Sequence, residues 1–170
     1  MSDKRIPLAG VIGSPISHSQ SPRLHGYWLR RYAVPGFYIP MEIAHDDLEE
    51  TLRTLPKMGF VGLNVTIPHK ETVLNIADQV SDRASLSGAA NTLSFQNGKI
   101  HADNTDVHGF LENLRQGAPD WHASAGPAAV LGAGGAARAV ISALIEAGVT
   151  EIRLANRTRS RSEALRTEFG

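Results

Sequence analysis

Asn64-Val65-Thr66-Ile67-Pro68-His69-Lys70-Glu71 is the stretch from which the fold of this chain is predicted. It continues an apolar run, residues 60–65, that is typical of a buried strand. Pro68 fits the first turn of a helix and cannot continue a strand ladder, so a helix is predicted to begin there. Lys70 would then follow the carboxyl end of a strand, the edge at which open α/β sheets bind ligands. A cation is disfavoured at a helix N-terminus, so this lysine is either functional or simply solvated on the surface.

Strands and helices are predicted to alternate on both sides of this stretch. On the N-terminal side we expect strands over residues 6–12 and 36–41, a helix starting at Pro22 with Ser21 as its N-cap, and a helix opened by Asp46-Asp47. The elements predicted on the C-terminal side are a short helix within 81–88, strands over 90–95 and 99–102 joined by a turn at Asn97-Gly98, a helix over 105–115, strands over 128–131 and 151–155, and helices over 135–147 and 160–169. This alternation predicts an α/β fold with a mostly parallel sheet.

The composition excludes several classes of protein. Lys+Arg 17 against Asp+Glu 17 gives a formal net charge of +0, which argues against a nucleic-acid partner. The sequence has no cysteine, hence no disulfide and no thiolate zinc site. No apolar run approaches the roughly 20 residues that span a bilayer, so we expect no membrane partner and a soluble, cytoplasmic protein. These features do not determine the oligomeric state, and a homodimer stays open.

A glycine-rich loop lies between the strand predicted over 128–131 and the helix that follows it. It reads Gly132-Ala133-Gly134-Gly135-Ala136-Ala137, the pattern G-x-G-x-x-A. The first glycine allows a tight turn, the second lets the backbone approach a pyrophosphate, and the small last residue lets the helix pack on the strand. The helix N-terminus would face the phosphate charge. We predict that this loop binds a dinucleotide; a tight turn without a ligand is the alternative.

The residues after the next predicted strand indicate which dinucleotide binds. NAD-binding folds typically carry an acidic residue there, whereas this chain has Asn156-Arg157-Thr158-Arg159-Ser160-Arg161 and no acid before Glu163. Guanidinium groups pair bidentately with phosphate, which suits the 2′-phosphate of NADP. We therefore favour NADP over NAD, with a solvated basic turn as the alternative. The predicted cofactor contacts in this segment are Asn156, Arg157, Thr158 and Arg161.

Four polar motifs precede the glycine loop. They are Ser19-Gln20-Ser21-Pro22, Asn64-Val65-Thr66-Ile67-Pro68-His69-Lys70, Gly88-Ala89-Ala90-Asn91-Thr92 and Asp103-Asn104-Thr105-Asp106. With the glycine loop and Asn156-Arg157-Thr158, this set resembles the shikimate dehydrogenase family, from residue 6 to the last residue. The resemblance implies NADP-dependent interconversion of 3-dehydroshikimate and shikimate, a step of chorismate and aromatic amino acid biosynthesis.

The resemblance also implies a domain organisation. Residues 1–104 would form an N-terminal α/β substrate-binding domain, residues 105–126 a linking helix and linker, and residues 127–170 the first part of a Rossmann NADP-binding domain. The Gly- and Pro-containing run 117–127 fits a boundary. Because the chain ends after two predicted strands of a fold that normally has about six, we expect it to be a fragment of a longer protein. The active site is expected in the cleft between the two parts.

The family's site residues can be matched one by one. Its carboxylate-binding serines match Ser19 and Ser21, and its catalytic lysine matches Lys70, paired with Asp106. Its ligands for the substrate hydroxyls match Asn64, Thr66, Asn91 and Asp106.

Elementary chemistry supports these roles. Serine hydroxyls and N–H groups at a helix N-terminus suit a carboxylate, and Ser19, which has no predicted capping duty, would have the freer hydroxyl. Carbonyl reduction needs a proton donor at the oxygen, which Lys70 would supply while Asp106 holds its ammonium in place. Plain capping by the serines, and turn-forming roles for Asn91 and Asp106, are the structural alternatives.

Several alternatives stay open at this stage. The cluster His101, Asp103, Asp106 and His108 has no recognised zinc spacing, so no metal is predicted. His69 is predicted to be a surface histidine. After Asp106 the family usually has glycine, whereas Val107 and His108 stand here before a glycine. Quinate could replace or join shikimate as the substrate, and the chain could be a non-catalytic module that binds shikimate or NADP.

Overall fold

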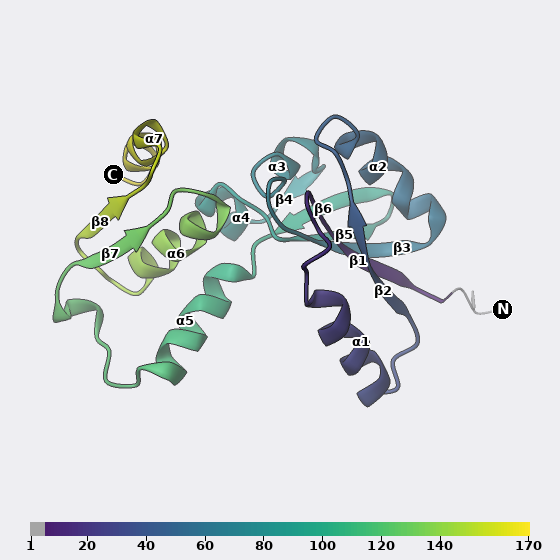
Figure 1. The fold of residues 1–170 in the computed structure, drawn as a ribbon, viewed down its shortest axis with the longest axis horizontal. Helices are drawn as coiled ribbons and strands as arrows, with labels where there is room; N and C mark the ends of the chain where they lie inside the picture. Colours follow the sequence, from purple (N-terminus) through teal and green to yellow (C-terminus); the bar gives the residue numbers. More distant parts are fainter. Residues whose placement is uncertain (1–5) are drawn as a thin grey trace.

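Six strands form the larger sheet of the computed structural model, which describes residues 6–170 (Figure 1). In spatial order they are β2 (Phe37–Glu42), β1 (Leu8–Gly13), β3 (Phe60–Val65), β5 (Thr92–Gln96), β6 (Lys99–Asp103) and β4 (Gln79–Val80). β1 pairs in parallel with β2 and β3, and β4 with β6. β5 runs antiparallel to both neighbours, and Asn97-Gly98, both with positive φ, turns it into β6 as predicted.

Helices cover this sheet unequally. One face packs against α2 (Leu48–Thr54), the 3-10 turn η1 (Leu55–Met58), α3 (Val73–Ile76) and α4 (Asp82–Ser87). The core lies here, with Leu52, Val73 and Leu93 almost fully buried. α1 (Ser21–Arg31) lies on the other side of the sheet and contributes no fully buried residue (Figure 1).

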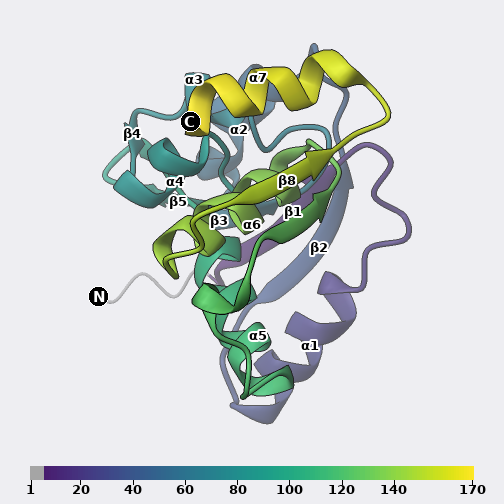
Figure 2. The same ribbon diagram turned by 90° about the vertical axis from the view of Figure 1, so that its left-hand side faces the viewer.

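A second, smaller sheet carries the glycine loop. β7 (Ala128–Leu131) and β8 (Ile152–Ala155) pair in parallel, with α6 (Gly135–Glu146) between them in sequence and α7 (Arg159–Phe169) after them. α5 (Asp106–Gly117) and the 3-10 turn η2 (Ala123–Ala125) lead from the larger sheet to this unit. Figure 2 shows α7 above the β7-β8 pair and α5 below it. α5 and α6 share a small core in which Val107, Leu111 and Ala139 are buried.

The predicted α/β fold with a mostly parallel sheet is confirmed, while two predicted helix starts are wrong. The helix expected at Pro68 begins at Val73, because the Lys70 carbonyl accepts a hydrogen bond from Ala90 N (2.8 Å) and is not available to a helix ladder. The first helix includes Ser21, and its N-cap is Gln20. β4 was not predicted, since a two-residue strand has no periodicity to detect.

Two further predictions concern the extent of the chain. The first five residues of the domain predicted over 1–104 lie outside the described residues. Over residues 6–170, no helix combines the length and the apolar character that crossing a membrane requires.

Candidate active site

The turn after β3 and the start of α5 bring Lys70 and Asp106 together. Lys70 Nζ donates a hydrogen bond to Asp106 Oδ2 at 2.5 Å, across 36 positions of sequence. The lysine side chain is 13% exposed and the aspartate 35%, so the pair is largely withdrawn from water but still reachable. Such a pair holds an ammonium group at a fixed place, which is what a proton donor requires.

Tertiary contacts shape the turn that carries Lys70. Val65 N donates to Asn91 O (2.8 Å), and the Lys70 carbonyl accepts from Ala90 N (2.8 Å), so the turn is bound to the segment before β5 at both ends. His69 lies between them in sequence, and its side chain is fully buried with Nε2 2.8 Å from Ile43 O. The prediction of a surface histidine is therefore wrong. The ring fixes the turn against the residue that follows β2.

Asp106 is oriented by two asparagines. Asn91 Nδ2 donates to Asp106 Oδ1 (2.7 Å), and Asp106 N donates to Asn104 Oδ1 (2.9 Å). Asn104 is fully buried, and its Nδ2 donates to Ser87 Oγ and Ala89 O, both at 2.9 Å. Both carboxylate oxygens of Asp106 are thus engaged, one by Lys70 and one by Asn91. Sequence reasoning gave Asn104 no role, although its place in the motif 103–106 was the available signal.

Asn91 makes contacts that a local turn residue would not make. Its Nδ2 also lies 2.9 Å from Thr105 Oγ1, and its Oδ1 accepts from Thr105 N (2.9 Å) and from Thr92 Oγ1 (2.9 Å). Because most of these bonds cross 14 or 15 positions, Asn91 ties the start of β5 to the start of α5. It occupies the centre of the polar cluster around Asp106.

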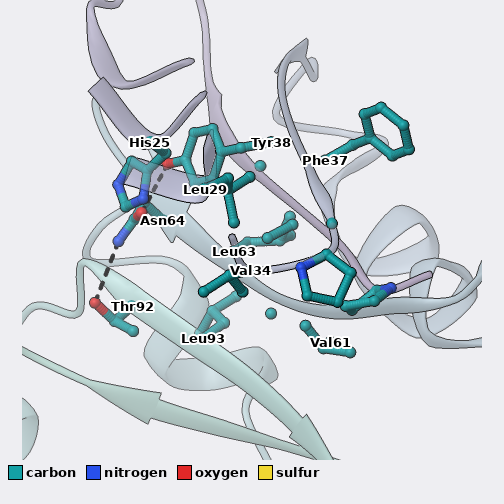
Figure 3. A pocket seen from close by; sticks show the side chains of 16 residues that line it. His25, Leu29, Val34, Phe37, Tyr38, Val61, Leu63, Asn64, Thr92 and Leu93 are labelled. Atoms are coloured by element: carbon teal, nitrogen blue, oxygen red, sulfur yellow. Dashed lines mark hydrogen bonds between the residues drawn. The ribbon is translucent and has the colours of Figure 1, made fainter. Parts of the chain in front are cut away.

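Asn64 and Thr66 lie at the end of β3. Asn64 Oδ1 accepts from the Tyr38 hydroxyl (2.7 Å), and Asn64 Nδ2 lies 3.4 Å from both Asn91 O and Thr92 Oγ1 (Figure 3). Thr66 N donates to Ile12 O (2.9 Å), which fixes the threonine beside the end of β1. Hydrogen bonds therefore connect Asn64 through Thr92 and Asn91 to Asp106.

The two serines differ from what was predicted. Ser21 lies inside α1 rather than at its N-cap, and Ser21 N donates to Ser19 Oγ at 3.3 Å. Ser19, which was expected to have no capping role, is thus the serine whose hydroxyl accepts a hydrogen bond from a helix N–H. Ser21 lies beside Tyr38, where its side chain opposes the effect of burial on the pKa of that tyrosine. The end of α1 that carries the serines therefore adjoins Asn64 through Tyr38.

The glycine loop closes one side of a cavity that contains Lys70. This cavity, of about 380 Å³, is lined by residues of the turn after β3, of the glycine loop and of α7, among them Ile67, Pro68, Lys70, Gly134, Gly135 and Arg161. A Cβ on Gly135 would lie 3.1 Å from Lys70 Cβ, so the loop touches the lysine directly. Gly135 occupies an unrestricted position of G-x-G-x-x-A, so the dinucleotide pattern itself does not call for glycine there.

The loop has the shape that a pyrophosphate requires. Gly132 has φ +116°, and its N–H donates to Ala155 O (2.7 Å), which forms the tight turn after β7. Within the described residues, a Cβ on Gly132 or Gly134 would meet no atom within 4 Å, so the space beside the backbone is open. The N-cap of α6 is Gly134, whose lack of a side chain leaves the helix N-terminus uncovered. Ala133 is buried, Ala136 is exposed, and Ala137 packs against the β7-β8 core.

The basic segment after β8 lies beside the glycine loop, because β7 and β8 run parallel and end at the same edge of the small sheet. Asn156 Nδ2 donates to Thr158 O (2.7 Å) and folds the segment into a turn. Arg159 pairs with Glu163 (2.8 Å), whereas Arg157 is exposed and Arg161 reaches the cavity. The donor set suits a phosphate of NADP.

Arg138 is a contact that sequence reasoning missed. It is 13% exposed, and it pairs with Glu168 of α7 (2.6 Å) and approaches Glu71 beside Lys70 (3.7 Å). Only the tertiary structure identifies this role, because no motif contains the residue. The arginine ties α6 and α7 to the turn after β3.

A second cavity, of about 430 Å³, does not contain Lys70 (Figure 3). Leu29, Val34 and Val61 give it an apolar wall, and His25, Tyr38 and Asn64 form its polar edge. We therefore assign the chemistry to the smaller cavity beside Lys70.

Comparisons with known proteins agree with these observations. The family model described as the shikimate dehydrogenase substrate binding domain matches residues 11–93, and that described as shikimate / quinate 5-dehydrogenase matches residues 118–170. The shikimate dehydrogenase (NADP(+)) of Roseobacter denitrificans is 67% identical over 171 residues, covering 100% of this chain and 62% of that protein.

Two solved structures are also similar. Shikimate dehydrogenase from Aquifex aeolicus superimposes with a TM-score of 0.90 at 37% identity, covering 99% of this chain and 62% of that one. The Thermus thermophilus enzyme in complex with NADP(H) and shikimate gives 0.86 at 41% identity, covering 98% of this chain and 61% of that one. The chain thus spans about 62% of the length of the relatives it matches. Its two family matches, this identity and this fold together show that the chain belongs to the shikimate dehydrogenase family.

Proposed function

We propose that this chain carries the substrate-binding part and the first cofactor-binding part of an NADP-dependent oxidoreductase that interconverts 3-dehydroshikimate and shikimate. The observation that carries the proposal is the position of the Lys70–Asp106 pair in one cavity with the glycine loop. The similar proteins named above, which include a complex with NADP(H) and shikimate, support it. The function would lie in the shikimate pathway, which leads to chorismate and the aromatic amino acids.

Lys70 is the proton carrier in this proposal. In reduction, its ammonium gives a proton to the oxygen of the substrate carbonyl as that oxygen becomes an alkoxide. In the reverse direction, the neutral amine takes the proton of the hydroxyl. Asp106 orients the ammonium through Oδ2, and Asn91 holds the other carboxylate oxygen, so the pair keeps one geometry. Bound NADP supplies or accepts the hydride.

The remaining polar residues would bind the two ends of the substrate. Ser19 and Ser21 would meet its carboxylate, and Asn64, Thr66 and Asn91 would meet its ring hydroxyls together with Asp106. The cofactor would be held by Gly132, Ala133, Gly134, Gly135, Ala136 and Ala137 at its pyrophosphate, and by Asn156, Arg157, Thr158 and Arg161 at its 2′-phosphate. The open space beside Gly132 and Gly134 supports this fit.

Finer points belong to the same proposal. The domain limits 1–104, 105–126 and 127–170 fit the change from the larger to the smaller sheet. The cytoplasmic location stays a prediction, and a homodimer and quinate as a substrate stay open.

A lysine variant tests the proposal. The assay protein is residues 1–170 followed by the C-terminal part of the Roseobacter denitrificans relative, called the extended polypeptide below. NADPH formation from shikimate and NADP is measured for it and for Lys70→Ala. General acid–base catalysis contributes about 10²- to 10⁴-fold, so kcat should fall at least about 100-fold while KM for shikimate changes much less.

Two outcomes would count against the proposal. Near-normal turnover of Lys70→Ala would remove the lysine from the chemistry. A folded extended polypeptide that binds shikimate or NADP calorimetrically, yet forms no NADPH, would favour the non-catalytic binding module. Quinate offered in place of shikimate, in the same assay, decides the substrate preference.

A further inference from the structure

Two side chains outside the predicted site, Tyr38 and His25, lie next to Asn64. The Tyr38 hydroxyl lies 2.7 Å from Asn64 Oδ1, and the Tyr38 ring stacks on the His25 ring with centroids 4.0 Å apart and planes 3° apart (Figure 3). Tyr38 comes from β2 and His25 from α1, so three separate elements meet at this asparagine. No motif of the sequence singles out either aromatic residue.

The surroundings of Asn64 fix which way its side-chain amide faces. Asn91 O is a backbone carbonyl and can only accept, and it lies 3.4 Å from the Asn64 amide nitrogen. Turning the amide over would place Asn64 Oδ1 against this acceptor, which is unfavourable. Oδ1 therefore faces the Tyr38 hydroxyl, and the tyrosine must be the donor of that bond.

Tyr38 is suited to act only as a donor here. Burial raises the pKa of Tyr38 to about 12, and the neighbouring Ser21 side chain opposes part of that rise. The hydroxyl consequently keeps its proton throughout the neutral range. Burial also lowers the pKa of His25, so the ring stacked on the phenol is mostly uncharged near neutrality.

We propose that Tyr38 is a positioning residue that holds Asn64 with its Nδ2 directed toward the substrate. Its hydroxyl occupies one lone pair of Oδ1 with a short bond, whereas the contacts of Nδ2 within residues 6–170 are two long ones of 3.4 Å, so Nδ2 retains capacity to donate. Asn64 would thus offer N–H donors to a substrate hydroxyl oxygen rather than a carbonyl acceptor. His25 holds the plane of the phenol. The inference rests on the proposed role of Asn64 as a substrate ligand.

The first arm of the test needs no ligand. The side-chain amide signals of Asn64 are followed by nuclear magnetic resonance in the 170-residue chain, in wild type, Tyr38→Phe and the control Tyr32→Phe. Tyr32 is a 70% exposed tyrosine just after α1. Phenylalanine keeps the ring and the stacking on His25 but deletes the hydroxyl. The Asn64 amide signals should shift and their protons exchange faster with solvent in Tyr38→Phe only; unchanged signals in that variant would overturn the inference.

The second arm measures shikimate binding to the extended polypeptide by calorimetry. Loss of one orienting hydrogen bond should raise Kd for shikimate about three- to tenfold in Tyr38→Phe, with unchanged affinity for NADP. In an Asn64→Ala background the same change should have no further effect, because the tyrosine acts through the asparagine. Additive effects of the two substitutions, or equal losses for both ligands, would overturn the positioning role. A wild type that binds no shikimate would refute the proposed function, and the first arm would still decide the orientation of Asn64.

Discussion

Replacing Gly135 by alanine should lower the turnover of this protein without the gain in stability that glycine-to-alanine changes usually give in a helix. Gly135 is the first residue of α6, and a Cβ there would lie 3.1 Å from Lys70 Cβ and 3.2 Å from Lys70 Cδ. Carbon atoms pack at about 3.5–4.0 Å, so the lysine side chain must retreat by about 0.4 Å or more. The nearest atom, Lys70 Cβ, moves only with its backbone, so the turn that carries Lys70 must shift, and Nζ shifts with it relative to Asp106.

The magnitude of both effects can be worked out. A 1 Å misplacement at a reacting centre costs about 10²-fold, so about 0.4 Å should lower kcat about five- to tenfold. The helical backbone of Gly135 accepts alanine, which stabilises by about 0.4–1 kcal/mol through the unfolded state, but the close contact with Lys70 Cβ offsets this gain. The melting temperature should therefore not rise above the wild-type value. NADPH formation by the extended polypeptide and thermal unfolding measure the two quantities.

Gly109→Ala is the matched control. Gly109 lies within α5, and in the part of the chain that the structure describes a Cβ there would meet no atom within 4 Å. It should keep the gain of about 0.4–1 kcal/mol, so its melting temperature should rise by about 1–4 °C with wild-type kcat. The reasoning is refuted if Gly135→Ala keeps wild-type kcat, or if its melting temperature rises as much as that of Gly109→Ala.

Three further outcomes are expected. Asn104→Ala removes three side-chain hydrogen bonds, two of them buried, and should cost about 3 kcal/mol in urea unfolding, so a loss below about 1 kcal/mol would contradict this reasoning. Burial raises the pKa of Asp103, but hydrogen bonds from Ser81, Arg83 and the N–H of residue 104 outweigh it and leave the pKa below 3.8. Its stabilising effect is therefore full above pH 3.8 and lost as the pH falls through the folded pKa, so Asp103→Asn should flatten the decline of the urea midpoint below about pH 4; an equally steep decline would refute it. Arg161→Glu should raise KM for NADP about tenfold or more and leave NAD nearly unaffected, whereas equal losses for both would argue against a 2′-phosphate contact.

Periodicity and turn residues predicted most of the fold. Apolar runs located β1, β3, β7 and β8, and Asn97-Gly98 located the hairpin, because these signals are local in sequence. The helix start at Pro68 failed because a distant N–H, that of Ala90, takes the carbonyl of Lys70. Ser21 was misplaced by one position because the proline rule does not distinguish the first helical residue from the second.

The candidate site was predictable only in part. The pairing of Lys70 with Asp106 came from a resemblance, and no spacing argument predicts a contact across 36 residues. The burial of His69 depends on a carbonyl acceptor at Ile43, and a backbone group leaves no trace in the sequence. Tyr38 and Arg138 act through side chains of other elements, so only the assembled structure identifies them.

The contact between Gly135 and Lys70 limits how this protein can be recombined. A cofactor-binding half taken from another protein can satisfy every requirement for binding a dinucleotide and still carry a larger residue at the position of Gly135. Such a graft would bind NADP normally and displace the lysine of the other half. Exchange of halves between relatives should thus keep full turnover only when the incoming loop has glycine at that one position, because the two units otherwise fold around separate cores and meet at this contact.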